Sequence, residues 1–519
     1  MASAGRTAGH GSARRGRLLL CSCLGALAAL VSGCGGVTGF VAAGPSPVAS
    51  APGIGGASPD PAAKGVAPAP HTAATLALTD ARHSHDIAGG GSAAPYNYAP
   101  AVMRDSGGYR MWWCSQLPGA GPPGDDVLTA SAESASGPYT KAIAALSGSG
   151  KAGSFDAKHT CDPSVLRVGG IYYLYYTGSG PDRAHSNSIG VATSSDGVQF
   201  TRPGDDRPFV RPSFQRSRKN TYGVGQPAAV YLNGYFYLMY TDTTAANAGW
   251  NGAGQFVIRS TDPLFRTGVE VLAAQGFTPV TAPASVLGRS VVDAFSADLM
   301  WADTLNAWAL AHETSGATTI TFFSKDFRTQ PYHSIALRGA WQEGPGLIRT
   351  PQGHAPVSVS APCSQVPFDV VRATSSPSAP TGLSRFGVTA VGLHGCAGRA
   401  MAERTLFGFG YPSPQRTVDL VVSGGVVQVD RRSVAAALAT SVLNSPPPSV
   451  SALPVLAALD PGAAAVRAPG RPLAMLLSDH KLWPVSPTLP AVNSSPVEQL
   501  TDRQYDTYQR GQDLSVLRR

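Results

Sequence analysis

Four acidic residues stand at or near the start of short apolar stretches, where they could carry out proton-transfer chemistry. Asp162 precedes a proline, Glu343 opens a Glu-Gly-Pro sequence, Asp298 precedes an apolar run, and Asp86 follows His-Ser-His. Two carboxyl groups can act as a pair, because one protonates a leaving oxygen while the other activates water. Each residue also has an ordinary interpretation, as a turn cap or a solvated loop residue. They form a site only if the fold brings them together.

The sequence contains five copies of one pattern. In four of them a proline is followed by a short apolar strand, a glycine turn and an aromatic strand. Three prolines are spaced by 63 and 64 residues and four serines by 63, 66 and 64 residues, namely Pro100, Pro163 and Pro227, and Ser131, Ser194, Ser260 and Ser324. The fourth copy, residues 297–310, lacks the proline, and the fifth, residues 344–353, continues into residues 354–360. Because two independent markers keep one register, chance explains the pattern poorly.

Each copy predicts an antiparallel meander of two strands joined by a tight turn, a third strand after a longer loop and a short fourth. The third strands are expected at residues 127–133, 189–196, 256–262, 320–326 and 368–375. One such sheet cannot bury both of its faces, whereas five packed radially can, with few open edges. The expected fold class is all-β, a five-bladed β-propeller.

The chain divides into four predicted segments. These are a signal peptide at residues 1–33, a Gly/Ala/Pro-rich tether at 34–75, the propeller at 76–399, and a small mixed C-terminal extension at 400–519. In the extension, residues 406–411 and 418–429 predict strands, and residues 433–442 and 496–517 show helical periodicity. Nothing in the extension carries recognisable chemistry.

Three stretches carry a family resemblance. They are Asp-Pro-Ser-Val from Asp162, Gly-Gly-Ile-Tyr-Tyr-Leu-Tyr-Tyr-Thr ending at Thr177, and Ile-Gly-Val-Ala-Thr-Ser-Ser-Asp-Gly-Val-Gln-Phe from Ile189. Together they resemble the five-bladed propeller glycosidases, with glycoside hydrolase family 43 nearest and families 32, 62 and 130 as relatives. The resemblance spans about residues 85–395. It implies hydrolysis of glycosidic bonds, with arabinose- or xylose-containing polysaccharides as substrates by analogy.

The family's catalytic acids stand at the starts of the innermost strands, and this chain keeps only one of them. The resemblance aligns the base with Ala99, the residue that modulates the acid's pKa with Asp162, and the acid with Gln226. Glu343-Gly-Pro resembles the family's acid motif but lies on a different blade. We therefore expect the catalytic residues to be drawn from Asp162, Glu343 and Asp298, with Asp86 and Gln226 contacting substrate.

Aromatic and histidine side chains could complete the site. Tyr98, Trp250 and Trp341 are expected in open loops, where their rings could stack on sugars, whereas Trp112 suits the core. Three histidines are predicted near strand ends facing the funnel, and they are more often structural hydrogen-bonding residues than ligands: His159, His312 and His354. We expect no metal ion and no cofactor.

The N-terminus reads as an export signal with a lipid anchor. Residues 1–17 are basic without any acid, and residues 18–31 are an apolar run too short to span a bilayer comfortably. The run ends in Val-Ser-Gly-Cys at Cys34, which resembles a bacterial lipobox; an ordinary signal peptide or twin-arginine export at Arg14-Arg15 are the alternatives. We expect lipid at Cys34, the outer face of the cell membrane or the cell envelope as the location, and a flexible tether behind it.

Cysteine usage agrees with an oxidising compartment. Four cysteines remain beyond Cys34, and an even number favours two disulfides, of which three pairings exist. We prefer the pairings close in sequence, Cys114–Cys161 and Cys363–Cys396.

Charge argues against nucleic acid as a partner. The formal charge is 40 − 32 = +8, and about +4 without the four arginines of the first 17 residues, with no basic block of the kind that binds phosphates. The expected partners are a polysaccharide or cell-wall glycan and, through the lipid, the membrane. A glycan-binding lipoprotein that has lost catalysis is the main alternative, supported by Ala99 and Gln226. A propeller that binds other proteins is a third possibility.

Overall fold

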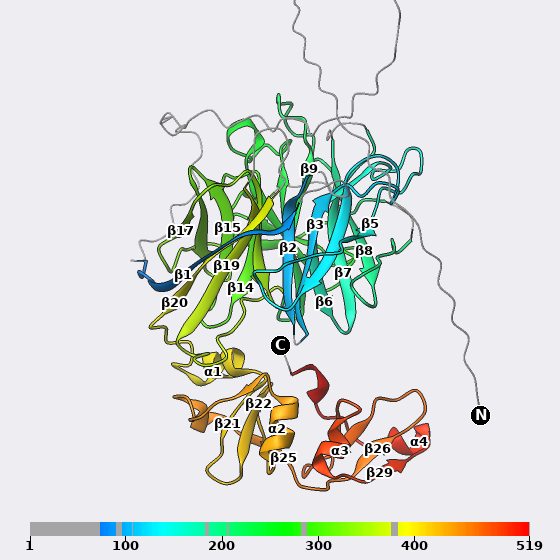
Figure 1. Cartoon of the computed structure of the whole chain (residues 1–519), viewed down its shortest axis with the longest axis vertical. Coiled ribbons are helices and arrows are strands. Elements are labelled where there is room, and N and C mark those ends of the chain that lie inside the picture. Colours follow the sequence, from blue (N-terminus) through cyan, green and yellow to red (C-terminus); the bar gives the residue numbers. More distant parts are fainter. Residues whose placement is uncertain are drawn as a thin grey trace, which may run out of the picture. The chain divides into compact units, whose positions relative to one another are not determined.

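The computed structural model describes residues 73–89, 96–105, 107–181, 186–204, 207–281, 288–374 and 382–517. The predicted signal peptide, lipidation at Cys34 and nearly all of the predicted tether lie outside these ranges. Residues 77 to 391 form antiparallel sheets that follow one another along the chain, and helices appear only after them, apart from one 3-10 turn (Figure 1). No helix within the described ranges combines the length and apolarity needed to cross a membrane.

The sheets are five blades, which we number in chain order. Blade 1 consists of β2 (Tyr98–Asp105), β3 (Gly108–Ser115), β4 (Asp126–Ala132) and β5 (Ile143–Leu146). Blade 2 consists of β6 (His159–Val168), β7 (Ile171–Ser179) and β8 (Ser188–Ser194), extended by the Thr193–Thr201 bridge. Blade 3 consists of β9 (Val224–Leu232), β10 (Tyr235–Asp242), β11 (Gln255–Ser260), β12 (Glu270–Ala273) and β13 (Gly276–Pro279). Blade 4 consists of β14 (Ala297–Ala302), β15 (Ala307–Thr314), β16 (Ala317–Phe323) and β17 (Ile335–Arg338). Blade 5 consists of β18 (Glu343–Arg349), β19 (Gln365–Ala373), β20 (Gly382–Val391) and β1 (Ala77–Gly89).

The blades close into a ring. Each innermost strand (β2, β6, β9, β14 and β18) contacts the next, and the last contacts the first, where β18 also pairs with β2 in parallel. Five separate hydrophobic clusters fill the spaces between consecutive blades, including the space between blades 5 and 1. The predicted five-bladed β-propeller is therefore confirmed.

The first strand of the chain completes the last blade. β1 pairs antiparallel with β20, from Ala77 opposite Val391 to Gly89 opposite Gly382. This pairing covers the edge of β20 that would otherwise be open, and it joins the two ends of the propeller sequence.

One departure from the predicted strands occurs in the fifth copy. Residues 354–360 do not form a strand beside β18, because the chain turns at Thr350–Gly353 and His354 then lies against Trp301 of blade 4. The segment expected as the third strand of this copy, residues 368–375, falls instead largely in the second strand, β19, and β20 is the third.

A buried arginine links four blades at the axis. Arg349 Nη1 donates hydrogen bonds to the carbonyl oxygens of Ala229, at 3.0 Å, and of Leu299, at 2.8 Å. Its Nη2 lies 3.2 Å from Ser164 Oγ, and Nη1 lies 3.1 Å from Oδ1 of Asp298. Blades 2, 3, 4 and 5 thus meet at one guanidinium group.

The innermost strands share an unusual backbone at one face of the ring, which we call the mouth: the face where these strands begin. Ala99, Asp162, Gln226 and Gly344 have φ of 44°, 47°, 53° and 52°, and each precedes a proline. Only Gly344 lacks a side chain, and a Cβ there would lie 2.8 Å from the Cα of Ala99. Left-handed backbone is costly for residues with a Cβ and is concentrated at functional sites. The recurring proline of the sequence therefore marks a built feature of the mouth.

The C-terminal region forms two further sheets with short helices. The first contains β21 (Phe409–Pro412), β22 (Val418–Val422), β23 (Gly425–Val429), β24 (Ser441–Val442) and β25 (Val455–Leu459), with α1 (Arg399–Leu406) and α2 (Arg432–Leu438). The second contains β26 (Ala465–Arg467), β27 (Ala474–Leu476), β28 (Leu482–Pro484) and β29 (Val497–Gln499), with α3 (Leu489–Asn493) and α4 (Asp502–Tyr505). The predicted hairpin followed by a helix is present as β22, β23 and α2. The helix predicted over 496–517 is wrong except for α4, because residues 497–499 pair with β26 instead.

We predict that Arg349→Met strongly destabilises the propeller, because it leaves the buried carboxylate of Asp298 without its partner. Removing one member of a buried ion pair costs about 3–5 kcal/mol. The double variant Asp298→Asn/Arg349→Met should recover part of that loss. Urea unfolding followed by tryptophan fluorescence measures both values. A single variant as stable as wild type would contradict the assigned role of Arg349.

Candidate functional site

A small cavity of about 30 Å³ lies at the mouth, on the axis of the ring. It is lined by the X-Pro positions of blades 1, 2, 3 and 5 and by the start of β14 in blade 4. Its walls are formed by Ala99, Pro100, Asp162, Pro163, Gln226, Pro227, Ser296, Ala297, Asp298, Gly344 and Pro345. Residues about sixty positions apart in the sequence therefore converge at one point, as the repeat predicts.

Asp162 is the buried carboxylate of this cluster. Only 7% of the residue is exposed, and the Tyr222 hydroxyl donates to its Oδ2 at 2.9 Å. Burial raises the pKa of Asp162 to about 6, and hydrogen bonds from Thr177 and Tyr222 oppose this increase. At neutral pH Asp162 is therefore mainly ionised, in a desolvated position.

Glu343 stands beside it as the first residue of β18, and it is partly exposed. Burial, followed by repulsion from Asp162 and then from Asp125, raises the pKa of Glu343 to about 8. Within the described part of the chain, no hydrogen bond or ion pair engages its carboxyl group. Glu343 is therefore mainly protonated at neutral pH and free to donate that proton.

Asp125 is a third carboxylate of the cluster, and the sequence analysis missed it. It ends the loop between β3 and β4, and its side chain is 23% exposed. The Tyr96 hydroxyl donates to its Oδ1, and His159 Nδ1 lies 3.0 Å from its Oδ2. Asp125 directly precedes β4, the third strand of blade 1, and not an innermost strand, so the repeat gave no reason to select it.

Two tyrosines border the carboxylates. The pKa of Tyr98 is raised well above its ordinary value by burial and by the charges of Asp125 and Glu343. The pKa of Tyr222 is raised by burial and by Asp162. Both phenols remain protonated and polar. Tyr98, predicted as a stacking ring, thus lies among the carboxylates, and Tyr222 was not predicted.

Both predicted disulfides are confirmed. Cys114–Cys161 joins the end of β3 in blade 1 to the start of β6 in blade 2, directly beside Asp162, and fixes the two blades that carry Asp125 and Asp162. Cys363–Cys396 joins the segment before β19 to the segment that leads into α1.

Asp298 lines the mouth, but its carboxylate is already engaged by partners within the fold. One carboxylate oxygen pairs with Arg349 and the other accepts a hydrogen bond from the Leu347 amide at 2.7 Å. Burial raises the pKa of Asp298, while Arg349 lowers it. Its buried ion pair with Arg349 gives it a structural role, and with 6% of the residue exposed it is poorly accessible to substrate, contrary to its selection as a catalytic candidate.

The predicted substrate-binding residues are divided between the mouth and other places. Gln226 lines the axial cavity, and its buried Oε1 has no hydrogen-bond partner among the described residues. Trp250 is 64% exposed in the loop between β10 and β11, and Trp341 lies two residues before Glu343, with its indole donating to Thr314 O at 2.8 Å. Asp86 lies exposed on β1, the outermost strand of blade 5, away from the carboxylate cluster.

The three histidines have structural partners. His159 contacts Asp125 at the mouth, and His312 lies beside Thr321 on β15 and β16. His354 does not face the mouth as predicted, because β18 has crossed to the other face before the chain reaches it; there it contacts Asp303 at 2.7 Å. One group in the described ranges has metal-ligand spacing, Cys114, Asp125 and Cys161, but its two sulfurs form a disulfide.

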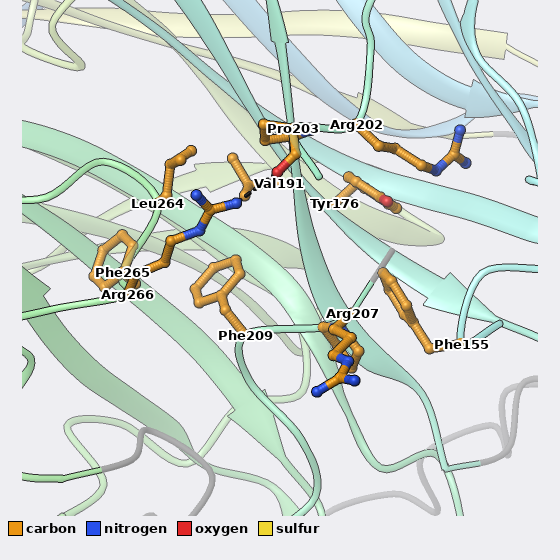
Figure 2. Close-up of a pocket in the computed structure, with 11 residues that line it drawn as sticks. Phe155, Tyr176, Val191, Arg202, Pro203, Arg207, Phe209, Leu264, Phe265 and Arg266 are labelled. Carbon is orange, nitrogen blue, oxygen red and sulfur yellow. Dashed lines mark hydrogen bonds between the residues drawn. The ribbon is translucent and has the colours of Figure 1, made fainter. Parts of the chain in front are cut away.

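A larger cavity, of about 340 Å³, lies away from the carboxylates. Figure 2 shows Arg207, Arg266 and Phe209 around it, with Arg202 at its side. The Arg202 guanidinium is already paired with Asp156 at 2.6 Å. None of the residues that line this cavity carries a carboxyl group. It can therefore hold a ligand but cannot supply an acid and a base, which the mouth can.

Comparisons with known proteins give distant structural similarities. Neither protein-family models nor curated protein sequences match the chain. The family 117 glycoside hydrolase Zg3597 from Zobellia galactanivorans is 14% identical over 59% of this chain and 90% of its own, with a TM-score of 0.40. The catalytic domain of the GH62 α-L-arabinofuranosidase from Coprinopsis cinerea is 13% identical over 60% of this chain and 97% of its own, with a TM-score of 0.38.

A third similar structure is a GH43 β-xylosidase/α-arabinofuranosidase from a compost microbial metagenome. It is 13% identical over 58% of this chain and 95% of its own, with a TM-score of 0.36. Families 43 and 62 are among those that the sequence motifs resemble. At this level of similarity the fold assignment rests on the strand pairing within the chain, and the chemistry on its own side chains.

We predict that Glu343→Gln stabilises the protein at alkaline pH. The ordinary glutamate pKa is 4.5, so between pH 4.5 and about 8 the unfolded chain loses this proton while the folded chain keeps it. The free energy of unfolding therefore falls as pH rises through this window. Glutamine removes that loss, so at pH 9 the variant should unfold at a higher temperature than wild type. Its free energy of unfolding should be larger by at least about 1 kcal/mol.

Thermal unfolding at pH 4 and pH 9 tests this expectation, with Glu133→Gln as the control, because Glu133 is an exposed glutamate directly after β4, at the opposite face. A wild-type protein as stable as Glu343→Gln at pH 9 would show that Glu343 ionises normally.

Proposed function

We propose that the chain is a glycoside hydrolase that acts on a polysaccharide at the mouth of its propeller. The observation that carries this proposal is the pair formed by Glu343 and Asp162. The Glu343 carboxyl group is mainly protonated at neutral pH, and the neighbouring Asp162 is mainly ionised and buried. Environments that separate the pKa values of two carboxyl groups are the arrangement that acid–base hydrolysis requires.

Glu343 donates its proton to the glycosidic oxygen as the bond to the anomeric carbon breaks. Burial keeps that proton on Glu343, and the negative charge of Asp162 adds to this effect because it opposes ionisation of a second carboxylate nearby. Tyr222 holds Asp162 in place through the 2.9 Å hydrogen bond. In this proposal the unpartnered Oε1 of Gln226, which lines the axial cavity, contacts the sugar, and the rings of Trp250 and Trp341 are assigned to sugar stacking.

The proposed substrates are arabinose- or xylose-containing polysaccharides. Support comes from the sequence resemblance, and two of the similar structures are an α-L-arabinofuranosidase and a β-xylosidase/α-arabinofuranosidase. Release of reducing sugar from arabinan, xylan and cell-wall arabinogalactan tests the proposal.

We predict that Glu343→Gln lowers this hydrolysis by at least about 100-fold, as expected when a general acid is lost. Asp162→Asn should lower it less at acidic pH than at neutral pH, because Glu343 then ionises at lower pH. Glu133→Gln serves as the matched control, with activity equal to wild type. Equal activity in wild type and Glu343→Gln would exclude Glu343 as the acid.

The dependence of activity on pH follows from the same two groups. Asp162 affects the pH profile by raising the pKa of Glu343. Glu343 must be protonated, so kcat/KM should fall through about pH 8. Initial rates from pH 4 to pH 10 measure this falling limb; in Asp162→Asn it should move toward lower pH. An unchanged falling limb in that variant would contradict the coupling between the two residues.

A glycan-binding protein without catalysis is the second candidate. Ala99 and Gln226 stand at two mouth positions where the resemblance places acids, and the unpartnered Gln226 Oε1 can accept a hydrogen bond from a sugar hydroxyl. Saturable binding of an oligosaccharide with no release of sugar by wild type would favour this function.

We further propose that the protein is exported and held at the outer face of the cell membrane by lipid on Cys34. The two disulfides are compatible with an oxidising compartment. We predict that Cys34→Ser moves the protein from the membrane fraction to the soluble extracytoplasmic fraction. Immunoblotting of both fractions measures the change, and Cys21→Ser is the control that should stay with the membrane. Retention of Cys34→Ser on the membrane would contradict lipid anchoring at this residue.

A further inference from the structure

We propose that Asp125 is the base that activates the attacking water, so that the chain takes its acid from blade 5 and its base from a loop of blade 1. This inference rests on the proposed hydrolase function and names a catalytic residue that neither the repeat nor the resemblance selects. Its evidence is the geometry around Asp125.

The other candidates for the base are unsuitable. Ala99 has no ionisable group. Asp162 is 7% exposed, and hydrogen bonds from Tyr222 and Thr177 engage its carboxylate, so water has little access to it. Asp298 is held by Arg349 and by the Leu347 amide. A general base has to contact the water from which it removes a proton.

Asp125 combines exposure with a fixed position. Its side chain is 23% exposed, whereas its carbonyl oxygen accepts a hydrogen bond from the Thr160 amide at 2.9 Å. A carboxylate oxygen of Asp125 and the sulfurs of Cys114 and Cys161 all lie within 4.8 Å of one another. Cys161 directly precedes Asp162, so the disulfide and the Thr160 bond keep Asp125 at the edge of the acid cluster.

Two neighbours orient the carboxylate. Tyr96 donates to Oδ1, and His159 Nδ1 lies 3.0 Å from Oδ2. Each carboxylate oxygen has two lone pairs, so both retain capacity to accept a hydrogen bond from water. The ionisable groups that face Asp125 are Tyr96, Tyr98, Asp126, His159, Asp162 and Glu343.

The proposed step is a direct displacement by water at the anomeric carbon. Asp125 takes a proton from water, and the water oxygen forms a bond to the anomeric carbon. The bond from that carbon to the leaving oxygen breaks, and the leaving oxygen takes the proton of Glu343. Asp125 ends protonated and Glu343 ionised, and both exchange protons with solvent. Because water attacks directly from the face opposite the leaving group, the anomeric configuration is inverted.

The first test compares Asp125→Asn, Glu343→Gln and the control Glu133→Gln on two substrates, xylan or arabinan and a 2,4-dinitrophenyl glycoside of the same sugar. A dinitrophenolate needs no proton to leave, so Glu343→Gln should regain most of its activity on the aryl glycoside. Asp125→Asn should stay at least about 100-fold below wild type on both substrates, since attack by water still needs a base. Asp125→Asn with wild-type kcat on an active protein would overturn this inference and leave Glu343 as the acid.

The second test uses wild type alone and does not depend on whether a variant folds. Proton NMR of the first sugar released, recorded before mutarotation, gives its anomeric configuration. Inversion supports direct attack by water with Asp125 as the base, and retention overturns it. A wild-type protein that releases no sugar from any of these substrates would contradict the proposed function itself, and this inference with it.

Discussion

The guanidinium group of Arg349 is the point on which the ring depends. It donates to carbonyl oxygens of blades 3 and 4, lies within hydrogen-bond distance of a serine of blade 2, and neutralises Asp298, while its own strand belongs to blade 5. A charge in this position is tolerated because each of its partners is fixed by an innermost strand. Asp298, the carboxylate that pairs with Arg349, also lines the cavity of about 30 Å³ at the mouth.

The chemistry at the mouth follows from that closure. Four X-Pro positions with left-handed backbone surround the cavity, and two of them carry the side chains of Asp162 and Gln226. The Cys114–Cys161 disulfide then connects blades 1 and 2 beside Asp162, close to Asp125. Three carboxyl groups therefore lie close together, and burial, reinforced by repulsion from Asp162 and Asp125, keeps Glu343 protonated.

The sequence was sufficient for the fold because the propeller repeats. Proline and serine spacings set the blades, and pairing of nearby cysteines predicted both disulfides. Asp162 was found because it occupies an X-Pro position of the repeat, and Glu343 because it directly precedes the equivalent position, Gly344. The repeat could not show that Arg349 would neutralise Asp298, since that contact joins two different blades. It also gave no signal for Asp125 or Tyr222, which lie in loops whose lengths differ from blade to blade. The strand assignment of the fifth copy was wrong after residue 353, because His354 contacts Tyr231 of blade 3 and Asp303 of blade 4.

The pairing of β1 with β20 has a consequence for how the chain acquires its structure. The earliest strand to be synthesised has no partner until residue 391 has been made, about three hundred residues later. Such long-range pairing has a high entropic cost and makes folding slow. The propeller therefore cannot close until the chain has been made as far as β20, and the last blade is completed by joining the two ends of the domain.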